Sequence, residues 1–310
     1  MDLAKKIQFL TLDVISAVGL GKPFGMLRAD ADIDGYVAAS EQGLRIANTF
    51  AALGLSWVVQ APGIGKLLAP SPRDATGFGA MMGACVAYIS ERVKDKGAGG
   101  NERRDMLASF MRHGLLGDDL HSEVFETLVA GSDTTAGALR AVMLYVMSHP
   151  RVQVKLQREI DEAMRDGIVP TGMGAGVISL AVAKQLPYLQ AVVREGLRIW
   201  PPVRNLLPKD VPAGGDTVML QGKPVYLPGG AEIGVSTLAM HRDKGLYGDD
   251  ADMFRPERWF EQDAEKLAAM TRVNELTFGF GRWQCLGKPV AQMELNKVLF
   301  EASRQARGPF

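Results

Sequence analysis

The sequence predicts a mainly α-helical protein with a long central helix and a small β-sheet insert. Of the 310 residues, 47% are hydrophobic, which is enough to bury a sizeable core. Apolar residues recur at helical spacing along most of the chain, and alternating runs typical of short strands occur only between 203 and 240. There is no internal repeat and no clear linker, so we expect a single domain over 1–310.

The first half of the chain is predicted to form a series of helices. They are expected over 1–20, in one or two pieces over 34–60, over 73–95 and over 106–112. The longest helical run covers about 119–148 and would be roughly 45 Å long at 1.5 Å per residue. Pro150 is expected to end it, because the residue before a proline is disfavoured in the helical region.

The second half combines helices with the sheet insert. Helices are predicted over 152–165, over 187–200 with proline in the first turn, and over 290–299. Strands are predicted over 217–220, 225–227 and 232–236, where proline, glycine and β-branched residues alternate. The segment between the last strand and the final helix is expected to be loop.

Charge and cysteine content exclude several classes of protein. Lysine plus arginine and aspartate plus glutamate both number 35, so no charge imbalance points to nucleic acid. Two cysteines are too few for a disulfide framework, and four histidines without helical pairing argue against zinc. The chain shows no signal-peptide pattern and no apolar run long enough to span a membrane. The apolar stretch 49–61 could touch a membrane surface, but a buried or substrate-facing helix is the favoured interpretation.

A glycine-framed run near the C-terminus, Phe278 to Gly287, places Cys285 directly before the last predicted helix. Gly281 and Gly287 would permit backbone angles that turn several N–H groups toward the sulfur. Such donors, together with a helix N-terminus, favour a thiolate, and a rigidly held thiolate suits an axial haem ligand. The alternative is a buried structural cysteine, since free cysteines are usually buried.

The middle of the long helix, residues 130–135, breaks the usual rules for a helix interior. Gly131 costs helix stability, and serine or threonine hydroxyls can bond back to the carbonyl four residues earlier. A kink there would make room for a small molecule. Asp133 could then supply an acid and Thr134 a hydroxyl for proton delivery. The alternative is simply a polar helix face.

The cysteine run resembles the haem-binding loop of cytochrome P-450 (haem-thiolate) monooxygenases, whose pattern is Phe-x-x-Gly-x-x-x-Cys-x-Gly. Phe278, Gly281, Cys285 and Gly287 match this pattern, and the run is similar to fungal members of the pisatin-demethylase-like type. Residues 130–135 match the family's Ala/Gly-Gly-x-Asp/Glu-Thr-Thr/Ser signature at every position. Ala291 and Glu294 also stand where the family usually has them on the next helix.

The resemblance implies a role for each matched residue. Cys285 would be the metal ligand of haem b, and Asp133 with Thr134 would form the acid–alcohol pair that delivers protons during oxygen activation. Residues along the cofactor would be Phe278, Gly281, Gly287, Ala130 and Gly131.

The sequence offers more than one candidate for recognition of the haem propionates. Trp283 stands where the family usually has an arginine or histidine, so either its N–H or the neighbouring Arg282 would serve the propionate. Lys209 stands where many relatives place a propionate-binding arginine, although a surface lysine is an equal alternative. Arg204 and Asn205 match a segment that lines the substrate pocket in relatives, where they could contact a polar substrate group or face solvent.

A structural ion-pair network is also implied. Glu195 and Arg198 lie three residues apart on one helix face, a spacing that alone indicates only a common surface pair. The family joins such a pair to a second arginine, here Arg258, in a buried triad that braces the haem loop. His241 also occurs in relatives, and we assign it a structural role only.

The function implied is that of a monooxygenase that inserts one oxygen atom from O2 into a small apolar organic substrate, as in secondary metabolism. The electrons would come from an NADPH-cytochrome P-450 reductase. The full-length relative would sit on the cytosolic face of the endoplasmic reticulum membrane. Compared with the family, the chain is expected to lack the N-terminal third and a C-terminal β-hairpin, so the alternative is a catalytically silent fragment unable to hold haem. Non-oxygenase chemistry is a third possibility, against which the intact Asp133–Thr134 pair argues.

Overall fold

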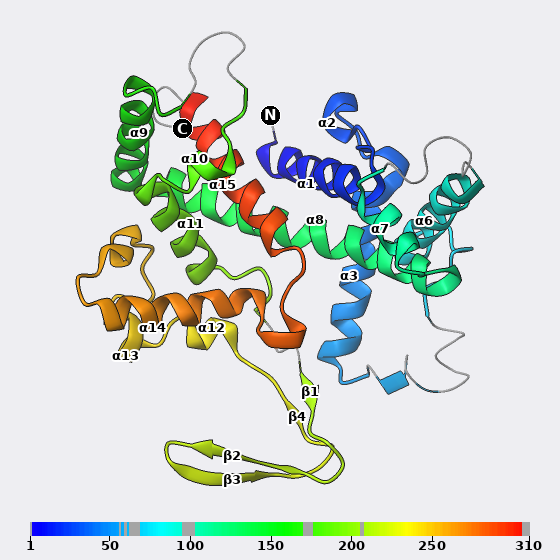
Figure 1. Ribbon diagram of the computed structural model, residues 1–310. Coiled ribbons are helices and arrows are strands. Elements are labelled where there is room, and N and C mark those ends of the chain that lie inside the picture. Colours follow the sequence, from blue (N-terminus) through cyan, green and yellow to red (C-terminus); the bar gives the residue numbers. More distant parts are fainter. Residues whose placement is uncertain are drawn as a thin grey trace. The chain divides into compact units, whose positions relative to one another are not determined.

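The computed structural model describes residues 2–55, 57–58, 61, 69–94, 103–169, 176–204 and 208–305. It is mainly helical with small antiparallel sheets, which confirms the predicted fold class (Figure 1). Two compact units divide the chain at the middle of the long helix, Met1–Ala136 and Gly137–Phe310. Each unit has its own packing and is described by itself.

The first unit is built only from helices in the part of the chain that the structure describes. Its elements are α1 (Leu3–Leu20), α2 (Met26–Ala29), the 3₁₀ helix η1 (Ile33–Gly35), α3 (Tyr36–Ala52), α6 (Gly77–Lys94), α7 (Met106–Arg112) and the first part of α8 (Gly117–Ser148). The predicted bounds of 106–112 are met, and the helix predicted over 1–20 ends at Leu20. Both helix starts are marked by a local signal in the sequence: the side chains of Asp2 and Asp105 cap the first turns of α1 and α7.

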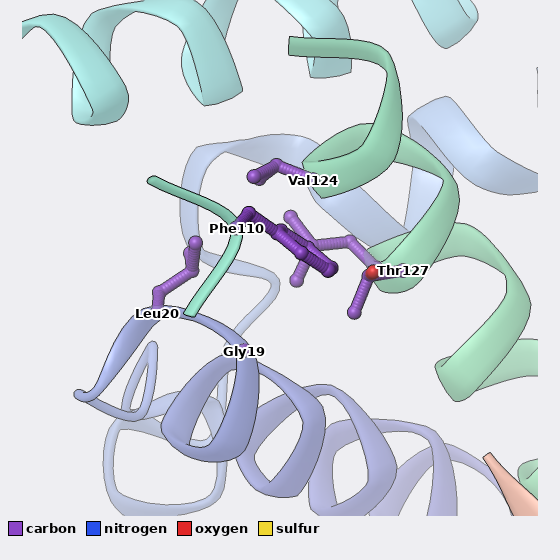
Figure 2. A pocket seen from close by; sticks show the side chains of 6 residues that line it. Gly19, Leu20, Phe110, Val124 and Thr127 are labelled. Carbon is purple, nitrogen blue, oxygen red and sulfur yellow. The ribbon is translucent and has the colours of Figure 1, made fainter. Parts of the chain in front are cut away.

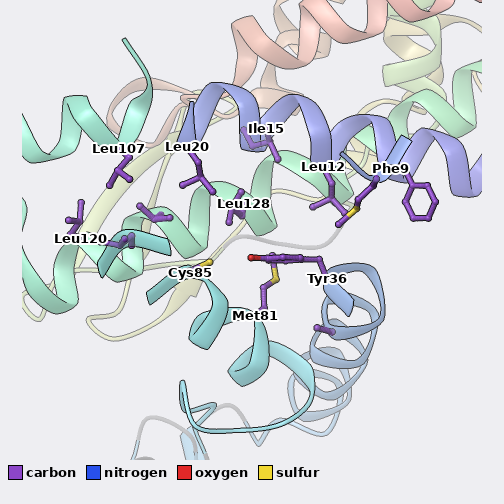
Figure 3. Packing of buried hydrophobic residues seen from close by; sticks show 14 residues of the cluster. Phe9, Leu12, Ile15, Leu20, Tyr36, Met81, Cys85, Leu107, Leu120 and Leu128 are labelled. Atoms are coloured by element: carbon purple, nitrogen blue, oxygen red, sulfur yellow. The ribbon is translucent and has the colours of Figure 1, made fainter. Parts of the chain in front are cut away.

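Apolar side chains from α1, α3, α6, α7 and α8 form the core of this unit (Figure 3). Phe9, Leu107 and Leu128 are fully enclosed, and burial of each such side chain contributes about 1.5–3 kcal/mol. Where α1, α7 and α8 meet, a small depression remains between Leu20, Phe110 and Thr127 (Figure 2). Its lining is almost wholly apolar, so it offers no set of polar groups that would recognise a ligand.

Helix α1 runs antiparallel along the first part of α8, and glycines bring the two backbones close together. A Cβ atom at Gly19 would lie 3.6 Å from Thr127, and one at Gly131 would lie 2.6 Å from the side chain of Ile15. The second distance is too short for a real contact. Helix packing therefore favours glycine at 131, because a larger residue would force the buried Ile15 side chain to shift.

This packing gives a stability prediction. Gly131→Ala is expected to lower the free energy of unfolding by about 1–3 kcal/mol, because the added methyl group overpacks against Ile15. Gly137→Ala in the same helix is the matched control: nothing lies within 4 Å of its Cβ position, so better helix propensity should raise stability by up to ~1 kcal/mol. Urea unfolding of both variants measures the difference. Equal stability of the two would show that α1 does not approach α8 this closely.

The second unit contains the remaining helices and both sheets. Its elements are the last part of α8, α9 (Pro150–Arg165), α10 (Leu180–Ala183), α11 (Pro187–Ile199), β1 (Lys209–Asp210), β2 (Asp216–Leu220), β3 (Lys223–Leu227), β4 (Glu232–Ile233), α12 (Thr237–Met240), α13 (Lys244–Tyr247), η2 (Pro256–Phe260), α14 (Ala264–Glu275), η3 (Leu276–Phe278), η4 (Gly281–Trp283) and α15 (Lys288–Gln305).

The predicted sheet insert is present as two antiparallel pairs. Strand β2 pairs with β3 in a hairpin, with Val218 opposite Val225. Strand β1 pairs with β4, with Lys209 opposite Ile233, and β4 is shorter than the predicted run 232–236. The short pairing holds Lys209 at the start of the insert.

Helix α11 is the most deeply buried helix of the second unit. Its Gly196 packs against α8, where a Cβ would lie 2.2 Å from Val142. Its first turn is held by Glu159 of α9, whose carboxylate accepts hydrogen bonds from the backbone N–H groups of Tyr188 and Leu189 at 2.7 and 2.8 Å. This cap satisfies donors that a helix start leaves unpaired.

The expectation that the segment before the cysteine run is loop was wrong. Helices α12, α13 and α14 occupy much of it, and α14 alone has 12 residues. The start of α14 is marked in the sequence by Asp263, whose side chain accepts hydrogen bonds from the N–H groups of Glu265 and Lys266. Its apolar face is narrow, so the periodic signal is weak, and burial of Met270 against the unit's core fixes the helix instead.

Candidate functional site

The segment that carries Cys285 runs from the end of η3 through η4 to the start of α15. Gly279 and Gly281 adopt positive φ angles of 72° and 62° there, and a Cβ at Gly279 would lie 2.8 Å from the carbonyl oxygen of Trp283. The N–H group of Cys285 donates to the carbonyl oxygen of Phe278 at 2.7 Å, which closes the loop. The turn therefore depends on glycine at two positions and places the sulfur next to the first turn of a helix.

Two expectations about this loop need correction. Gly287 does not have a positive φ; a Cβ there would make only an ordinary contact, 3.7 Å from the Cys285 sulfur, and Gly279 is the position that sequence reasoning missed. Several N–H groups were also expected to point at the sulfur. Among the described residues no hydrogen bond to that sulfur is formed, and the N–H group of Cys285 itself donates to the carbonyl oxygen of Phe278.

The two cysteines lie in opposite environments. Cys285 is exposed, whereas Cys85 is 1% exposed in the core of the first unit. Burial raises the pKa of the Cys85 thiol to about 12, so that thiol stays protonated and unreactive at neutral pH. The alternative of a buried structural cysteine therefore describes Cys85, and Cys285 is left as the candidate ligand.

Side chains around Cys285 form an exposed apolar surface with two cations. Phe280, Trp283 and Leu286 are 79%, 64% and 90% exposed. The Lys209 ammonium lies 5.3 Å from the centre of the Trp283 ring, and the Arg282 guanidinium lies 5.3 Å from the same centre. Neither cation has an ion-pair partner among the described residues.

These features fit a haem. The sulfur is available as an iron ligand, three exposed apolar side chains offer a surface for a large flat ring, and two cations could pair with its two carboxylates. The sequence left open how Trp283, Arg282 and Lys209 share the propionates. In the structure they form a single cluster in which both cations contact the Trp283 ring, so the indole supports the cations and does not replace them.

The segment 130–135 belongs to the first unit and remains helical throughout. The helix assignment is continuous from Gly117 to Ser148. The predicted back-bonding is present: the Thr134 hydroxyl donates to the Ala130 carbonyl oxygen at 2.8 Å, and the buried Ser132 hydroxyl donates to that of Leu128 at 2.8 Å. These bonds satisfy the hydroxyls within the helix, and they explain how it tolerates them.

Asp133 makes contacts that the sequence did not reveal. Its carboxylate accepts hydrogen bonds from the Gln8 amide of α1 and the Ser40 hydroxyl of α3. Both donors are almost completely buried, at 3% and 2% exposure. They lie 125 and 93 residues away along the chain, and no local pattern around them indicates this contact.

The predicted triad is confirmed in the second unit. The Glu195 carboxylate accepts two hydrogen bonds from Arg198, at 2.9 and 2.8 Å, and one from Arg258 at 2.9 Å. It also accepts from the Trp259 indole at 3.1 Å and the Arg255 backbone N–H at 2.8 Å. Glu195 and Arg198 are fully buried and Arg258 is nearly so. All charges in the triad are therefore paired, as burial requires.

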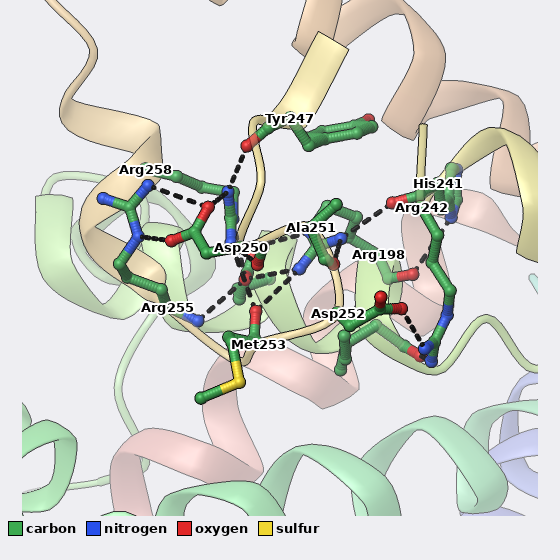
Figure 4. Close-up of polar contacts among 12 residues, drawn as sticks. Arg198, His241, Arg242, Tyr247, Asp250, Ala251, Asp252, Met253, Arg255 and Arg258 are labelled. Carbon is green, nitrogen blue, oxygen red and sulfur yellow. Dashed lines mark hydrogen bonds and ion pairs between the residues drawn. The ribbon is translucent and has the colours of Figure 1, made fainter. Parts of the chain in front are cut away.

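The triad also binds the chain that follows the sheet insert (Figure 4). Arg198 donates to the carbonyl oxygens of His241, Ala251 and Met253 at 2.6–3.0 Å. Arg258 donates to those of Tyr247, Asp250 and Met253 at 2.8–3.2 Å. Two guanidinium groups thus organise a loop region that has little regular secondary structure of its own.

The structural role assigned to His241 agrees with its position. The ring is completely buried between the carbonyl oxygens of Arg198 and Val273, 3.2 Å from each. Burial lowers the pKa of this imidazole, so the ring is neutral at physiological pH. Elsewhere, Arg204 stacks on Trp200, with its guanidinium 4.1 Å from the ring centre, and Asn205 lies outside the described residues.

Glu294 is an unusual carboxyl group on α15. It is 4% exposed, and neither of its oxygens has a hydrogen-bond partner within the described part of the chain. Burial raises its pKa to about 8. A carboxyl group in such surroundings is held in its neutral form over most of the physiological range.

Comparison with known proteins agrees with these features. Residues 1–301 match the family model described as Cytochrome P450, and the chain belongs to this family. It is similar to Cytochrome P450 monooxygenase ABA1 of Pyricularia oryzae, with 42% identity over 308 residues that cover 98% of this chain and 58% of the relative. Cytochrome P450 monooxygenase aba1 of Botryotinia fuckeliana is 38% identical over 305 residues, with the same shares.

A third relative covers a larger share of its own length. Cytochrome P450 monooxygenase ACRTS1 of Alternaria alternata is 30% identical over 311 residues, which are 98% of this chain and 80% of that protein. The chain spans 58% of the length of the ABA1 and aba1 relatives named above. Within the described residues no helix has the length and apolar character needed to cross a membrane, and no cluster of side chains suits a directly bound metal ion.

Proposed function

We propose that this chain is part of a haem-thiolate monooxygenase that inserts one oxygen atom from O2 into a small apolar organic substrate. The observation that carries the proposal is the exposed Cys285 in its glycine-dependent loop, with the Trp283 ring and two unpaired cations beside it. Family membership supports the same reaction class. A fungal enzyme of the pisatin-demethylase-like type, working in secondary metabolism, is the version that the sequence supports best.

Each residue has a defined task in this proposal. Haem b, when bound, supplies the iron chemistry that activates O2. Cys285 would hold the iron, and Lys209 and Arg282 would bind the propionates with Trp283 as their support. Residues along the cofactor would be Phe278, Gly281, Gly287, Ala130 and Gly131.

Proton delivery is assigned to the acid–alcohol pair. Asp133 would hold and release the proton, and Thr134 would pass it on through its hydroxyl. The Thr134 hydroxyl now donates to Ala130, which leaves its lone pairs free to accept a hydrogen bond. Glu195, Arg198 and Arg258 would keep the cysteine-bearing part of the chain in shape without touching the substrate.

We also propose a redox partner and a cellular location for the complete protein. Electrons would come from an NADPH-cytochrome P-450 reductase, and the complete protein, a single cytochrome P-450 domain, would act at the cytosolic face of the endoplasmic reticulum membrane. Formal net charge is zero, which agrees with a small uncharged partner better than with nucleic acid.

The test of this function asks which cysteine supplies the thiolate ligand of the haem iron. In haem-loaded protein, Cys285→Ser should abolish the red-shifted Soret band of the reduced carbon monoxide complex, because the hydroxyl cannot replace the thiolate ligand. Cys85→Ala is the matched control, and it should keep the band, since Cys85 lies in the core. A normal band in Cys285→Ser would refute the assignment. Failure of the unaltered chain to take up haem would support a catalytically silent chain instead.

A further inference from the structure

The Asp133 carboxylate is held by two neutral donors from two other helices. Its Oδ1 atom accepts from the Gln8 amide at 2.5 Å, and its Oδ2 atom accepts from the Ser40 hydroxyl. Each oxygen thus has its own donor, one from α1 and one from α3. With both oxygens occupied, the carboxylate cannot rotate without breaking a hydrogen bond.

The packing of α1 explains why Gln8 reaches this point. Ile15 lies against Gly131, and Gln8 is seven residues earlier on α1, which places it two turns away on the same helix face. Asp133 follows Gly131 by two residues. The close approach at Gly131 therefore fixes the distance between Gln8 and Asp133, and substitution there would disturb both.

Neither donor carries a charge. Among the described residues Asp133 has no ion-pair partner. The hydrogen bonds from Gln8 and Ser40 are therefore its stabilising polar contacts. A lysine or arginine in place of Gln8 or Ser40 would form a stronger, charge-assisted pair. Neutral donors fix the position of the carboxylate without placing an opposite charge beside it.

Asp133 and Thr134 are adjacent, so their side chains leave the helix about 100° apart. While Gln8 and Ser40 hold it, the Asp133 carboxylate faces α1 and α3, and the Thr134 hydroxyl faces a different direction. The direction from which Asp133 can receive a proton is consequently set by these two residues.

We propose that Gln8 and Ser40 are positioning residues that fix the Asp133 carboxylate for proton delivery in the monooxygenase reaction. The inference rests on the proposed function, because it assumes that Asp133 delivers protons during oxygen activation. It adds two residues from distant helices to the machinery and assigns no contact with substrate to either of them.

The first experiment tests the contact without haem. Ser40→Val and Ser40→Thr are a matched pair that differ in the hydroxyl group. In urea unfolding of the full chain, Ser40→Val should reduce the folding equilibrium constant at least about tenfold more than Ser40→Thr, since hydrogen bonds to charged groups are strong. In an Asp133→Ala background this difference should largely disappear. Equal effects in both backgrounds would overturn the inference.

The second experiment tests the role in the loaded enzyme. Ser40→Val and Gln8→Met should each raise, by several-fold, the share of consumed NADPH that appears as peroxide, and Ser40→Thr should restore coupling. Neither substitution should add to the uncoupling caused by Asp133→Ala, because both act through Asp133. Thr11→Val is the control: the buried Thr11 hydroxyl donates to the backbone carbonyl of Gln8 in its own helix and has no other partner in the described ranges, so coupling should not change.

Failure of the proposed function and failure of this inference give different results. If Thr134→Ala and Asp133→Ala leave coupling unchanged, proton delivery by the pair is refuted and the inference falls with it. If those two variants uncouple the enzyme and Ser40→Val and Gln8→Met do not, only the positioning role is overturned. Uncoupling by Ser40→Val that persists unchanged in the Asp133→Ala background would also overturn it.

Discussion

Replacing Glu195 with alanine is expected to leave little soluble protein. The substitution leaves the guanidinium groups of Arg198 and Arg258 buried without their shared carboxylate. Removing one partner of a buried ion pair costs roughly 3–5 kcal/mol, which is a large part of a domain's stability of about 5–15 kcal/mol. The loss should appear as a much lower urea midpoint or as aggregation during expression.

A nearby surface pair provides the control. Asp252 pairs with Arg242 at 2.9 Å beside the same loop, but its side chain is 61% exposed. Asp252→Ala should therefore change stability by less than about 1 kcal/mol. A stable Glu195→Ala variant with normal haem content and slow turnover would contradict the structural role and would make Glu195 part of the catalytic machinery.

Glu294→Gln is expected to stabilise the protein at alkaline pH. The pKa of Glu294 is about 8 in the folded chain, against an ordinary value of 4.5, so the folded state keeps a proton that the unfolded state has released. The free energy of unfolding of the unaltered protein should therefore fall as pH rises between 4.5 and 8. The full effect is roughly 4–5 kcal/mol, since one pKa unit corresponds to about 1.4 kcal/mol.

Glutamine has no proton to lose and is close to the neutral carboxyl in shape. The variant should match the unaltered protein near pH 4.5 and exceed it in stability near pH 8, as measured by urea unfolding at both values. Burial also raises the pKa of Glu159, so some pH dependence will remain in the variant. Glu265→Gln, at an exposed position of α14, is the control and should leave the pH dependence unchanged. Parallel curves for Glu294→Gln and the unaltered protein would show that Glu294 has a partner.

Much of the secondary structure could be predicted because its signals are local. Asp105 before α7 and Pro187 at the start of α11 mark helix starts, and α8 is long enough for its periodic pattern to be clear. Helix α14 was missed, since its apolar face is narrow and its contacts come from distant segments. Helices of this kind are fixed by tertiary packing more than by their own propensity.

The features of the candidate site also fall into those that the sequence predicts and those that depend on the tertiary structure. The sequence by itself determined the family, the cysteine run, the motif at residues 130–135 and the members of the triad, because these are short motifs or fixed spacings. Only the tertiary structure decided which cysteine is exposed and that Lys209 and Arg282 share the Trp283 ring. It also decided that Gln8 and Ser40 hold Asp133, and that Glu294 has no hydrogen-bond partner among the residues that the structure describes. The reason is physical: backbone preference depends on neighbouring residues, whereas burial and hydrogen bonding depend on groups that folding brings from far along the chain.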